Sequence, residues 1–247
     1  MVYLVGAGPG DPGLLTVKAH ACLKKADTVV YDYLADSRIL ALVSEEAECI
    51  YVGKSAGNHA VKQEDISKLL VKLSREGKCV VRLKGGDPYV LGRGGEEVLA
   101  CRAAGVRVEV VPGVTSAVAV PAAAGIPVTH RGLARGFSVV SAHEDLISTV
   151  PVRRDHTLVL LMGVRHLRRS VAILTDRGAD PRTPAAAVER GYRPDQRVTT
   201  TILHRLPDVA EAIGVSAPAV IVIGDVVTVS PAWKKRAAPR GRPAPRP

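Results

Sequence analysis

Three glycine-rich segments of the chain each follow a short apolar run that is typical of a β-strand. They are GAGPGDPG from residue 6, KGGDPYVLGRGGEE from residue 84 and VPGVTSA from residue 111. Loops of this kind at the carboxyl ends of parallel strands let a ligand approach the backbone closely. Asp32 and Lys54 end two further apolar runs, and a carboxylate and an amine placed there could move a proton. We therefore expect one ligand crevice lined by these loops.

The first of these loops also matches the pattern GxGxxG of dinucleotide sites over residues 8–13, and Asp32 ends the following strand. Two features argue against a bound diphosphate. Pro9 and Pro12 lack the N–H groups that a pyrophosphate needs, and Asp11 adds a negative charge at the same helix start. A ligand without phosphate, such as a nucleoside that carries an amino acid, fits these residues better.

The elements that must position these loops follow an α/β pattern. Strands are predicted at residues 2–5, 28–31, 49–52, 79–83, 106–111, 137–141, 157–162, 185–188 and 219–223. The β-branched run at 199–203 suits an antiparallel or edge strand. This order predicts a first α/β domain over residues 1–130, with a mostly parallel sheet, and a second α/β domain with a mixed sheet over residues 131–233. The turn-rich segment 125–132 reads as the linker between them.

Helix signals lie between several of the strands. Asp11 and Pro12 read as N-cap and first helical position of a helix that continues to about Ala26. A second helix is predicted from apolar residues at helical spacing, and Gly77 is its C-terminal stop. These apolar residues are Ile66, Leu69, Leu70 and Leu73. A third helix is predicted over residues 94–104.

The composition excludes several classes of protein. Hydrophobic residues make up 47% of the 247 residues, which is enough for a buried core and excludes global disorder. No apolar run approaches the about 18 residues of a membrane helix, and no basic leader precedes the first strand. The four cysteines are far apart and the histidines are not clustered, so we expect buried free thiols and no metal site. These features predict a soluble, cytoplasmic protein without membrane contact.

The net charge of +10 is concentrated at the C-terminus. Residues 234–247 contain six basic residues and no acidic one, whereas the rest of the chain has 28 basic against 24 acidic residues. The segment is rich in Pro and Arg, so we expect a disordered, solvated tail. A basic tail can also bind nucleic acid, and this alternative stays open although it is the weaker one.

The motifs together resemble those of the tetrapyrrole (precorrin) methylases. The matching segments are GAGPGDPGLLTVKA, VVYDYL, VGK, VRLKGGDPYVLGRGGEE, VPGVTSA and GIPVTHRG, and the resemblance spans about residues 2–225. It implies a two-domain tetrapyrrole methylase-like fold with a ligand cleft between the domains, S-adenosyl-L-methionine as methyl donor, no metal, and a homodimer. Within the family, the chain is most similar to the branch that methylates uroporphyrinogen III at C2 and C7. That reaction gives precorrin-2, via precorrin-1, on the way to sirohaem and cobalamin.

The resemblance also implies roles for single residues. Asp32 matches a proposed proton acceptor and Lys54 a proposed proton donor. The positions that match cofactor-binding residues are Pro9, Gly85, Gly86, Asp87, Val90, Thr115, Ser116, Met162, Gly191 and Ala219. Leu91 departs from the family, which usually has Phe before GRGG, and so does the segment 226–233. Arg93, His130 and Arg131 are candidates for binding the substrate, whose carboxylates suit a basic chain.

Each of these residues also has a structural interpretation. Asp32 could cap the turn after its strand, Lys54 could be solvated, and Met162 could be a core residue. Arg93 could pair with Glu96 or Glu97 instead of a substrate carboxylate. Three other functions stay open: a methylase of the same fold acting on a later corrin intermediate, a protein residue or a ribosomal RNA ribose; a nucleic-acid-binding protein; and a nicotinamide oxidoreductase.

Overall fold

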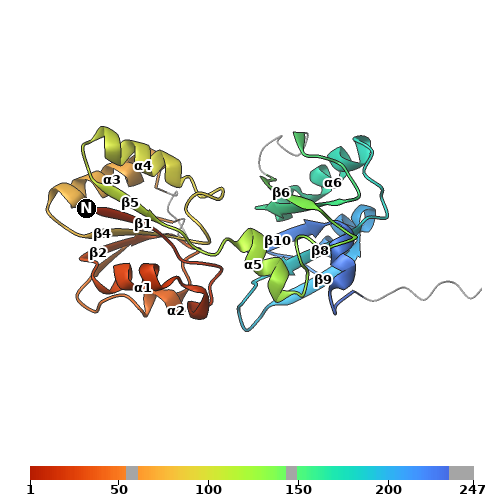
Figure 1. The fold of residues 1–247 in the computed structure, drawn as a ribbon, viewed down its shortest axis with the longest axis horizontal. Helices are drawn as coiled ribbons and strands as arrows, with labels where there is room; N and C mark the ends of the chain where they lie inside the picture. Colours follow the sequence, from red (N-terminus) through yellow and green to blue (C-terminus); the bar gives the residue numbers. More distant parts are fainter. Residues whose placement is uncertain (54–60, 143–148, 234–247) are drawn as a thin grey trace, which may run out of the picture.

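A computed structural model describes residues 1–53, 61–142 and 149–233 of the chain. Lys54 and the tail at 234–247 lie outside the described residues. The described part forms two five-stranded sheets, each covered by helices, which lie in two units joined at the start of helix α5 (Figure 1). We call residues 1–113 the first unit and residues 116–233 the second unit. The predicted α/β fold, with a parallel sheet followed by a mixed one, is confirmed.

The first unit has a parallel sheet in the order β3-β2-β4-β1-β5. In chain order its elements are β1 (Val2–Gly6), η1 (Pro12–Leu14), α1 (Val17–Lys24), β2 (Thr28–Tyr31), α2 (Ser37–Leu40), β3 (Glu48–Tyr51), α3 (Gln63–Arg75), β4 (Val80–Lys84), α4 (Gly94–Ala103) and β5 (Val108–Val111). Side chains alternate along β1, so Val5 packs with α1 and α2 on one face and Leu4 packs with α3 and α4 on the other. Because all five strands are parallel, their carboxyl ends lie at the same edge of the sheet.

The second unit has a mixed sheet in the order β6-β7-β10-β8-β9, in which only β6 and β7 are parallel. Its elements are α5 (Ser116–Ala123), β6 (Gly136–Ser141), β7 (His156–Leu161), η3 (Val164–His166), α6 (Leu167–Asp176), β8 (Pro184–Glu189), β9 (Arg197–Ile202), η4 (Leu203–Arg205), α7 (Leu206–Ala212), β10 (Ala219–Ile223) and η5 (Asp225–Val229). Helices α6 and α7 cover one face, and α5 with η5 cover the other. The β-branched run forms β9, which is antiparallel and at the edge, as predicted.

One helix prediction differs from the structure, and one helix was missed. The helix expected from Asp11 to Ala26 is split, because Leu15 is extended and Thr16 starts a new helix by accepting a hydrogen bond from Ala19 N at 3.1 Å. Asp11 does cap the first, short turn by accepting from Gly13 N at 2.8 Å. Helix α5 was not predicted, although Thr115 caps it and it contains Pro121.

The packing of α5 bears on the division into domains. Ala117 and Val120 belong to the same apolar cluster as Val188 and Val222 of the second sheet. By this packing the second core begins near Thr115, ahead of the boundary at residue 130 that the turn-rich segment suggests. The division into domains stays a prediction.

The thiols are free but not all buried. Cys22 and Cys101 are buried as expected, whereas Cys79 is half-buried and Cys49 is exposed on β3 at the sheet edge. Within the described ranges, no helix has the length and apolar character needed to cross a bilayer.

Glycines allow β1 and β5 to end in contact with the loop after β4. A Cβ atom at Gly113 would lie 2.2 Å from the carbonyl oxygen of Gly86 and 2.7 Å from the Cα of Gly6. We therefore expect Gly113→Ala to lower the melting temperature strongly, because backbone atoms must move to admit the methyl group. Calorimetric or fluorescence melting measures the effect. Gly95→Ala, in the first turns of α4 with open space around it, is the matched control and should be neutral or stabilising. Equal melting temperatures for the two variants would contradict this interpretation.

Candidate functional site

The three glycine-rich loops meet at the carboxyl edge of the first sheet. Gly8 N donates to Gly86 O at 3.1 Å and Gly86 N donates to Gly8 O at 2.8 Å, which joins the loops after β1 and β4. The carboxylate of Asp87 then accepts a hydrogen bond from Gly113 N at 3.0 Å, which adds the loop after β5. The predicted convergence of these loops is confirmed, and it brings Pro9, Gly86 and Asp87 together.

The surface that these loops present is largely bare backbone. Gly86 has φ +66°, and a Cβ placed on it would have ordinary contacts only with Thr115 and Ser116. Thr115 is the N-cap of α5, and its Oγ1 accepts from Ala117 N at 3.3 Å. The N–H and C=O groups of Gly8 and Gly86 are paired with each other, whereas Pro9, Gly85 and Asp87 beside them are half-buried. Glycine at these positions lets a ligand approach the backbone closely, which is compatible with the expected nucleoside that carries an amino acid.

Two further loops, in the second unit, hold the other candidate cofactor residues. Met162 follows β7 and Gly191 follows β8, and both loops have strained backbone: φ is +57° at Met162, +49° at Arg190 and +64° at Tyr192. Gly191 itself is packed so closely on α5 that a Cβ would lie 2.7 Å from Val120. Non-glycine residues with positive φ cost roughly 1–3 kcal/mol each and gather at binding sites.

The same strain occurs in the glycine-rich loop of the first unit. Leu91 and Arg93 have φ +54° and +57°. Together with Met162, Arg190 and Tyr192, they are the non-glycine residues with positive φ in the described part of the chain. All five lie in or beside segments that contain candidate site residues, and backbone strain of this kind is frequent at binding sites.

Glu189 anchors the turn that carries Gly191. Its side chain is fully buried and accepts hydrogen bonds from Arg197 Nη2 at 2.8 Å and from Ser216 N at 3.0 Å. Burial alone would raise the pKa of Glu189, but the hydrogen bonds from Arg197 and Ser216 outweigh it and hold the pKa below 4.5. Ala219 lies opposite Glu189 in the β8–β10 pair, which places this candidate residue beside the same anchor.

Asp32 has both of its oxygens engaged. Oδ1 accepts from Leu34 N at 3.2 Å, which is the turn cap of the structural interpretation, and Oδ2 accepts from Arg82 Nη2 at 2.8 Å. The side chain is still 26% exposed. Leu34 lies against Gly85, where a Cβ would come within 2.6 Å of the Leu34 Cβ. The turn of Asp32 is therefore next to the glycine-rich loop, and its role as proton acceptor stays a prediction.

A buried cluster of charges, which the sequence analysis missed, lies behind Asp32. Arg82 Nε is 3.1 Å from Glu97 Oε1, Lys84 Nζ is 3.1 Å from the same carboxylate, and Gln63 donates to it at 3.0 Å. Arg82, Lys84 and Glu97 are at most 5% exposed. With Asp32 the cluster holds two cations and two anions, which is how buried charges are tolerated. The sequence did contain one sign of this cluster: Arg82 is a charged residue inside the otherwise apolar run at 79–83, and a buried charge needs a partner.

The surroundings of Lys84 in this cluster lower its pKa. Burial lowers the pKa of its ammonium below 10.5, and the neighbouring Arg82 lowers it further, whereas Glu97 raises it. Glu97 is thus the largest of the influences that oppose the lowering of the Lys84 pKa.

The candidate substrate residues are exposed. Arg93 donates to Glu96 through Nε at 2.9 Å and Nη2 at 2.8 Å, so its partner in this structure is Glu96. His130 and Arg131 lie in a tight hairpin after α5, where His130 Nδ1 is 2.8 Å from the carbonyl of Arg131. Val90 N donates to Asp87 O at 3.3 Å, within the turn of the glycine-rich loop. Lys54 is outside the described residues.

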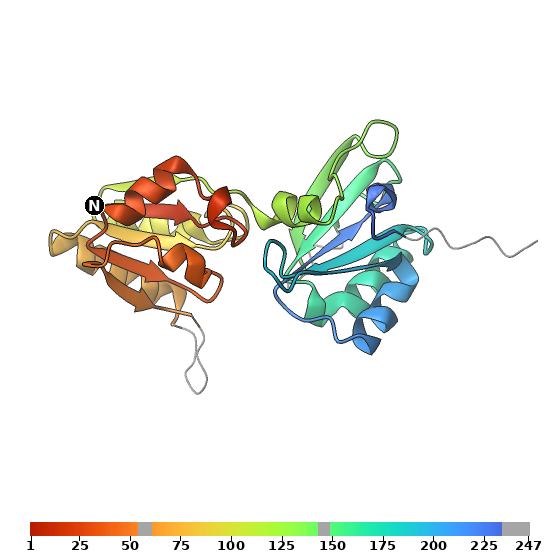
Figure 2. The same ribbon diagram turned by 90° about the horizontal axis from the view of Figure 1, so that it is seen from below.

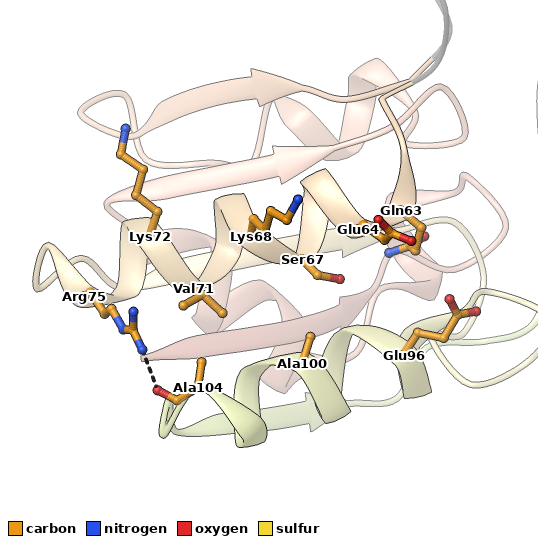
Figure 3. Close-up of a pocket in the computed structure, with 10 residues that line it drawn as sticks. All are labelled: Gln63, Glu64, Ser67, Lys68, Val71, Lys72, Arg75, Glu96, Ala100 and Ala104. Atoms are coloured by element: carbon orange, nitrogen blue, oxygen red, sulfur yellow. Dashed lines mark hydrogen bonds between the residues drawn. The ribbon is translucent and has the colours of Figure 1, made fainter.

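A groove between α3 and α4 is a separate feature (Figure 3). Lys68, Lys72 and Arg75 line it from α3, and Glu96 and Ala100 line it from α4. It runs along the outer face of the two helices and reaches the end of the glycine-rich segment 84–97 at Glu96, and we assign it no role. Among the described residues, no group of three or more His, Cys, Asp or Glu side chains could hold a metal ion.

The comparisons with known proteins agree with this geometry. The family model described as Tetrapyrrole (Corrin/Porphyrin) Methylases matches residues 1–207. The chain belongs to this family. It is 49% identical over 233 residues to the S-adenosyl-L-methionine-dependent uroporphyrinogen III methyltransferase of Methanosarcina barkeri, covering 92% of this chain and 91% of that protein. The predicted family is confirmed.

This tetrapyrrole methylase is also similar to a solved structure and to a longer curated protein. A crystal structure of uroporphyrin-III C-methyl transferase from Thermus thermophilus, complexed with S-adenyl homocysteine, has a TM-score of 0.78 and 46% identity, covering 92% of this chain and 93% of that one. The siroheme synthase of Methylococcus capsulatus is 45% identical over 232 residues, but these are 92% of this chain and only 49% of that longer protein.

The buried cluster of this methylase predicts a specific pattern of stability. Glu97→Gln leaves Arg82 and Lys84 buried with one anion between them, so we expect a loss of about 3–5 kcal/mol in the free energy of unfolding. The double variant Glu97→Gln/Lys84→Met removes one cation with one anion and should recover part of that loss. Denaturant unfolding at pH 7 measures both, and equal stabilities of the single and double variants would contradict the pairing.

The same pair gives a pH dependence. The folded-state pKa of Lys84 is below the unfolded value of 10.5, so the unfolded chain binds more protons between these two pKa values. Stability therefore rises with pH in this interval. We expect Glu97→Gln to approach the double variant in stability as the pH rises toward 10.5, because Lys84 then loses its charge.

Proposed function

We propose that this chain is an S-adenosyl-L-methionine-dependent methyltransferase that converts uroporphyrinogen III to precorrin-2, via precorrin-1, by methylation at C2 and C7. The observation that carries the proposal is the 49% identity over nearly the full length of a protein named for that reaction. The convergence of the three glycine loops supports it from the structure. The siroheme synthases among the relatives favour sirohaem biosynthesis as the destination of the product.

For the cofactor we propose a site that both units contribute to. From the first unit it takes the backbone and side chains at Pro9, Gly85, Gly86, Asp87 and Val90. From the cap of α5 and the second unit it takes Thr115, Ser116, Met162, Gly191 and Ala219. S-adenosyl-L-methionine supplies an already activated methyl group, so the protein mainly has to align the acceptor carbon with it. The strained loops at Met162 and Gly191 serve this purpose, because their conformation is fixed before the ligand binds.

Asp32 is the residue that we propose as proton acceptor. A pyrrole carbon that gains a methyl group must lose or relocate a proton, and a fixed carboxylate nearby can take it. Arg82 orients one oxygen of Asp32 and Leu34 N orients the other, while the side chain keeps access to solvent. We propose Lys54 as the donor of the complementary proton. Arg93, His130 and Arg131 are proposed to meet the carboxylates of the substrate.

We also propose that the enzyme works in the cytoplasm, as its composition predicts, and as a homodimer, as the family resemblance implies. The test of the function is incubation of the purified chain with freshly generated uroporphyrinogen III and S-adenosyl-L-methionine. Mass and absorption spectra should show the addition of one and then two methyl groups. Unchanged uroporphyrinogen III, or methylation of a later corrin intermediate instead, would contradict the assignment.

The role of Asp32 is tested by Asp32→Asn. The amide can still cap the turn at Leu34 but cannot accept the proton, so we expect turnover to fall by ~10²–10⁴-fold. The affinity for S-adenosylhomocysteine, measured by calorimetry, should stay near that of the unsubstituted protein.

Asp180→Asn is the matched control. Asp180 also caps a turn, at Arg182 N (2.9 Å), and also pairs with an arginine, Arg154 (2.8 Å), but it lies in the second unit away from the loops. Its substitution should leave turnover unchanged. Full activity of a folded Asp32→Asn protein would favour the turn cap as the only role of Asp32.

A further inference from the structure

Two loops of the proposed cofactor site touch across the junction of the units. Gly10 follows Pro9 in the first unit, and Tyr192 follows Gly191 in the second. The guanidinium of Arg38, which belongs to α2, donates through Nη2 to Gly10 O at 3.0 Å and to Tyr192 O at 3.3 Å. One side chain thus holds the backbone of both loops.

Asp36 fixes Arg38 and adds a second link between the units. Its Oδ1 accepts from Arg38 N at 3.0 Å and from Arg38 Nε at 2.9 Å, and its Oδ2 is 3.3 Å from Arg193 Nε. The carboxylate is only 9% exposed, and the hydrogen bond from Arg38 keeps the pKa of Asp36 below its ordinary value. Partly buried pairs between a carboxylate and arginine forks hold a fixed geometry.

The units otherwise have few contacts in the described part of the chain. Their helices and strands pack mostly within their own unit, and both views show the units side by side, connected at α5 (Figures 1 and 2). A junction of this kind leaves relative motion of the units as the default expectation. The contacts of Asp36, Arg38 and Arg193 lie at this junction, so they limit the distance between the loop at Gly10 and the loop at Tyr192.

We propose that Asp36, Arg38 and Arg193 form a clasp that holds the loops at Pro9 and Gly191 at the distance that the cofactor requires. This inference rests on the proposed function, because it takes these loops as the two sides of the cofactor site. The three residues are positioning residues that act through the loop backbone. When the clasp is broken, only a fraction of molecules has both loops in place, and the apparent affinity for the cofactor falls by that fraction.

The test compares Arg38→Met and Arg193→Met with a matched control, Arg153→Met. Arg153 also forms a bidentate ion pair with an aspartate two residues away, but within the second unit. Its Nε donates to Asp155 Oδ1 and its Nη2 donates to Asp155 Oδ2, both at 3.0 Å. Calorimetry with S-adenosylhomocysteine should show binding at least roughly fivefold weaker for the two clasp variants. The affinity of the control variant should be unchanged. Arg193→Lys keeps the charge beside Asp36 and should restore most of the affinity.

Kinetics and melting separate positioning from folding. We expect KM for S-adenosyl-L-methionine to rise in the clasp variants while kcat at saturating donor and the melting temperature stay near those of the unsubstituted protein. Unchanged affinity in both clasp variants, or a loss matched by a lower melting temperature, would overturn the clasp. If the unsubstituted protein does not bind S-adenosylhomocysteine, the proposed function fails instead.

Discussion

The backbones of three loops approach one another at the edge of the first sheet as closely as a polypeptide allows. Gly6, Gly86 and Gly113 have no side chain at the points of contact, and a Cβ on either Gly6 or Gly113 would lie within 2.6 Å of Gly86 O. This contact decides where the chain leaves the first unit, because Gly113 lies only two residues before Thr115, the cap of α5. The position of the second unit, and with it the loops at Met162 and Gly191, follows from that exit.

A second constraint is electrostatic and lies behind the first. Strand β4 is central in its sheet, yet it carries Arg82 and Lys84, which are buried. Glu97 on α4 and Asp32 after β2 neutralise them, so the charges link three elements that converge on the glycine loops. The cluster has a cost in desolvation, and what it provides is a fixed orientation for Asp32. Stability and the proposed proton transfer therefore depend on the same set of side chains.

Most of the fold could be predicted from the sequence because its signals are local. Apolar runs, glycine stops such as Gly77 and the cap at Asp11 each act within a few residues, and the strands appear where they were expected. Helix α5 was missed because its sequence is apolar throughout and contains Pro121, so it shows no helical periodicity. The glycine loops marked the region of the site, and the family resemblance supplied roles for its residues.

The remaining features could not be predicted because they depend on tertiary contacts. Nothing near Arg82 in the sequence indicates that Glu97 and Asp32 will meet it, and Arg38 and Tyr192 are distant in the chain. The positive φ of Met162 and Tyr192 likewise has no local signal, since neither residue favours that conformation. The sequence thus indicates the loops of the proposed site, and the structure adds the contacts that hold these loops in place.

Calorimetric titration of Gly86 variants with S-adenosylhomocysteine tests whether the backbone of these loops forms the cofactor site. Gly86→Ala should bind more weakly than the unsubstituted protein, and Gly86→Leu more weakly still, because the side chain enters the space beside Thr115 and Ser116. Gly77→Ala is the control: its φ of +87° gives it a similar backbone strain, with no atom within 4 Å and no part in the site. The account predicts lower stability but unchanged affinity for Gly77→Ala. Unchanged affinity for a folded Gly86→Leu protein would contradict it.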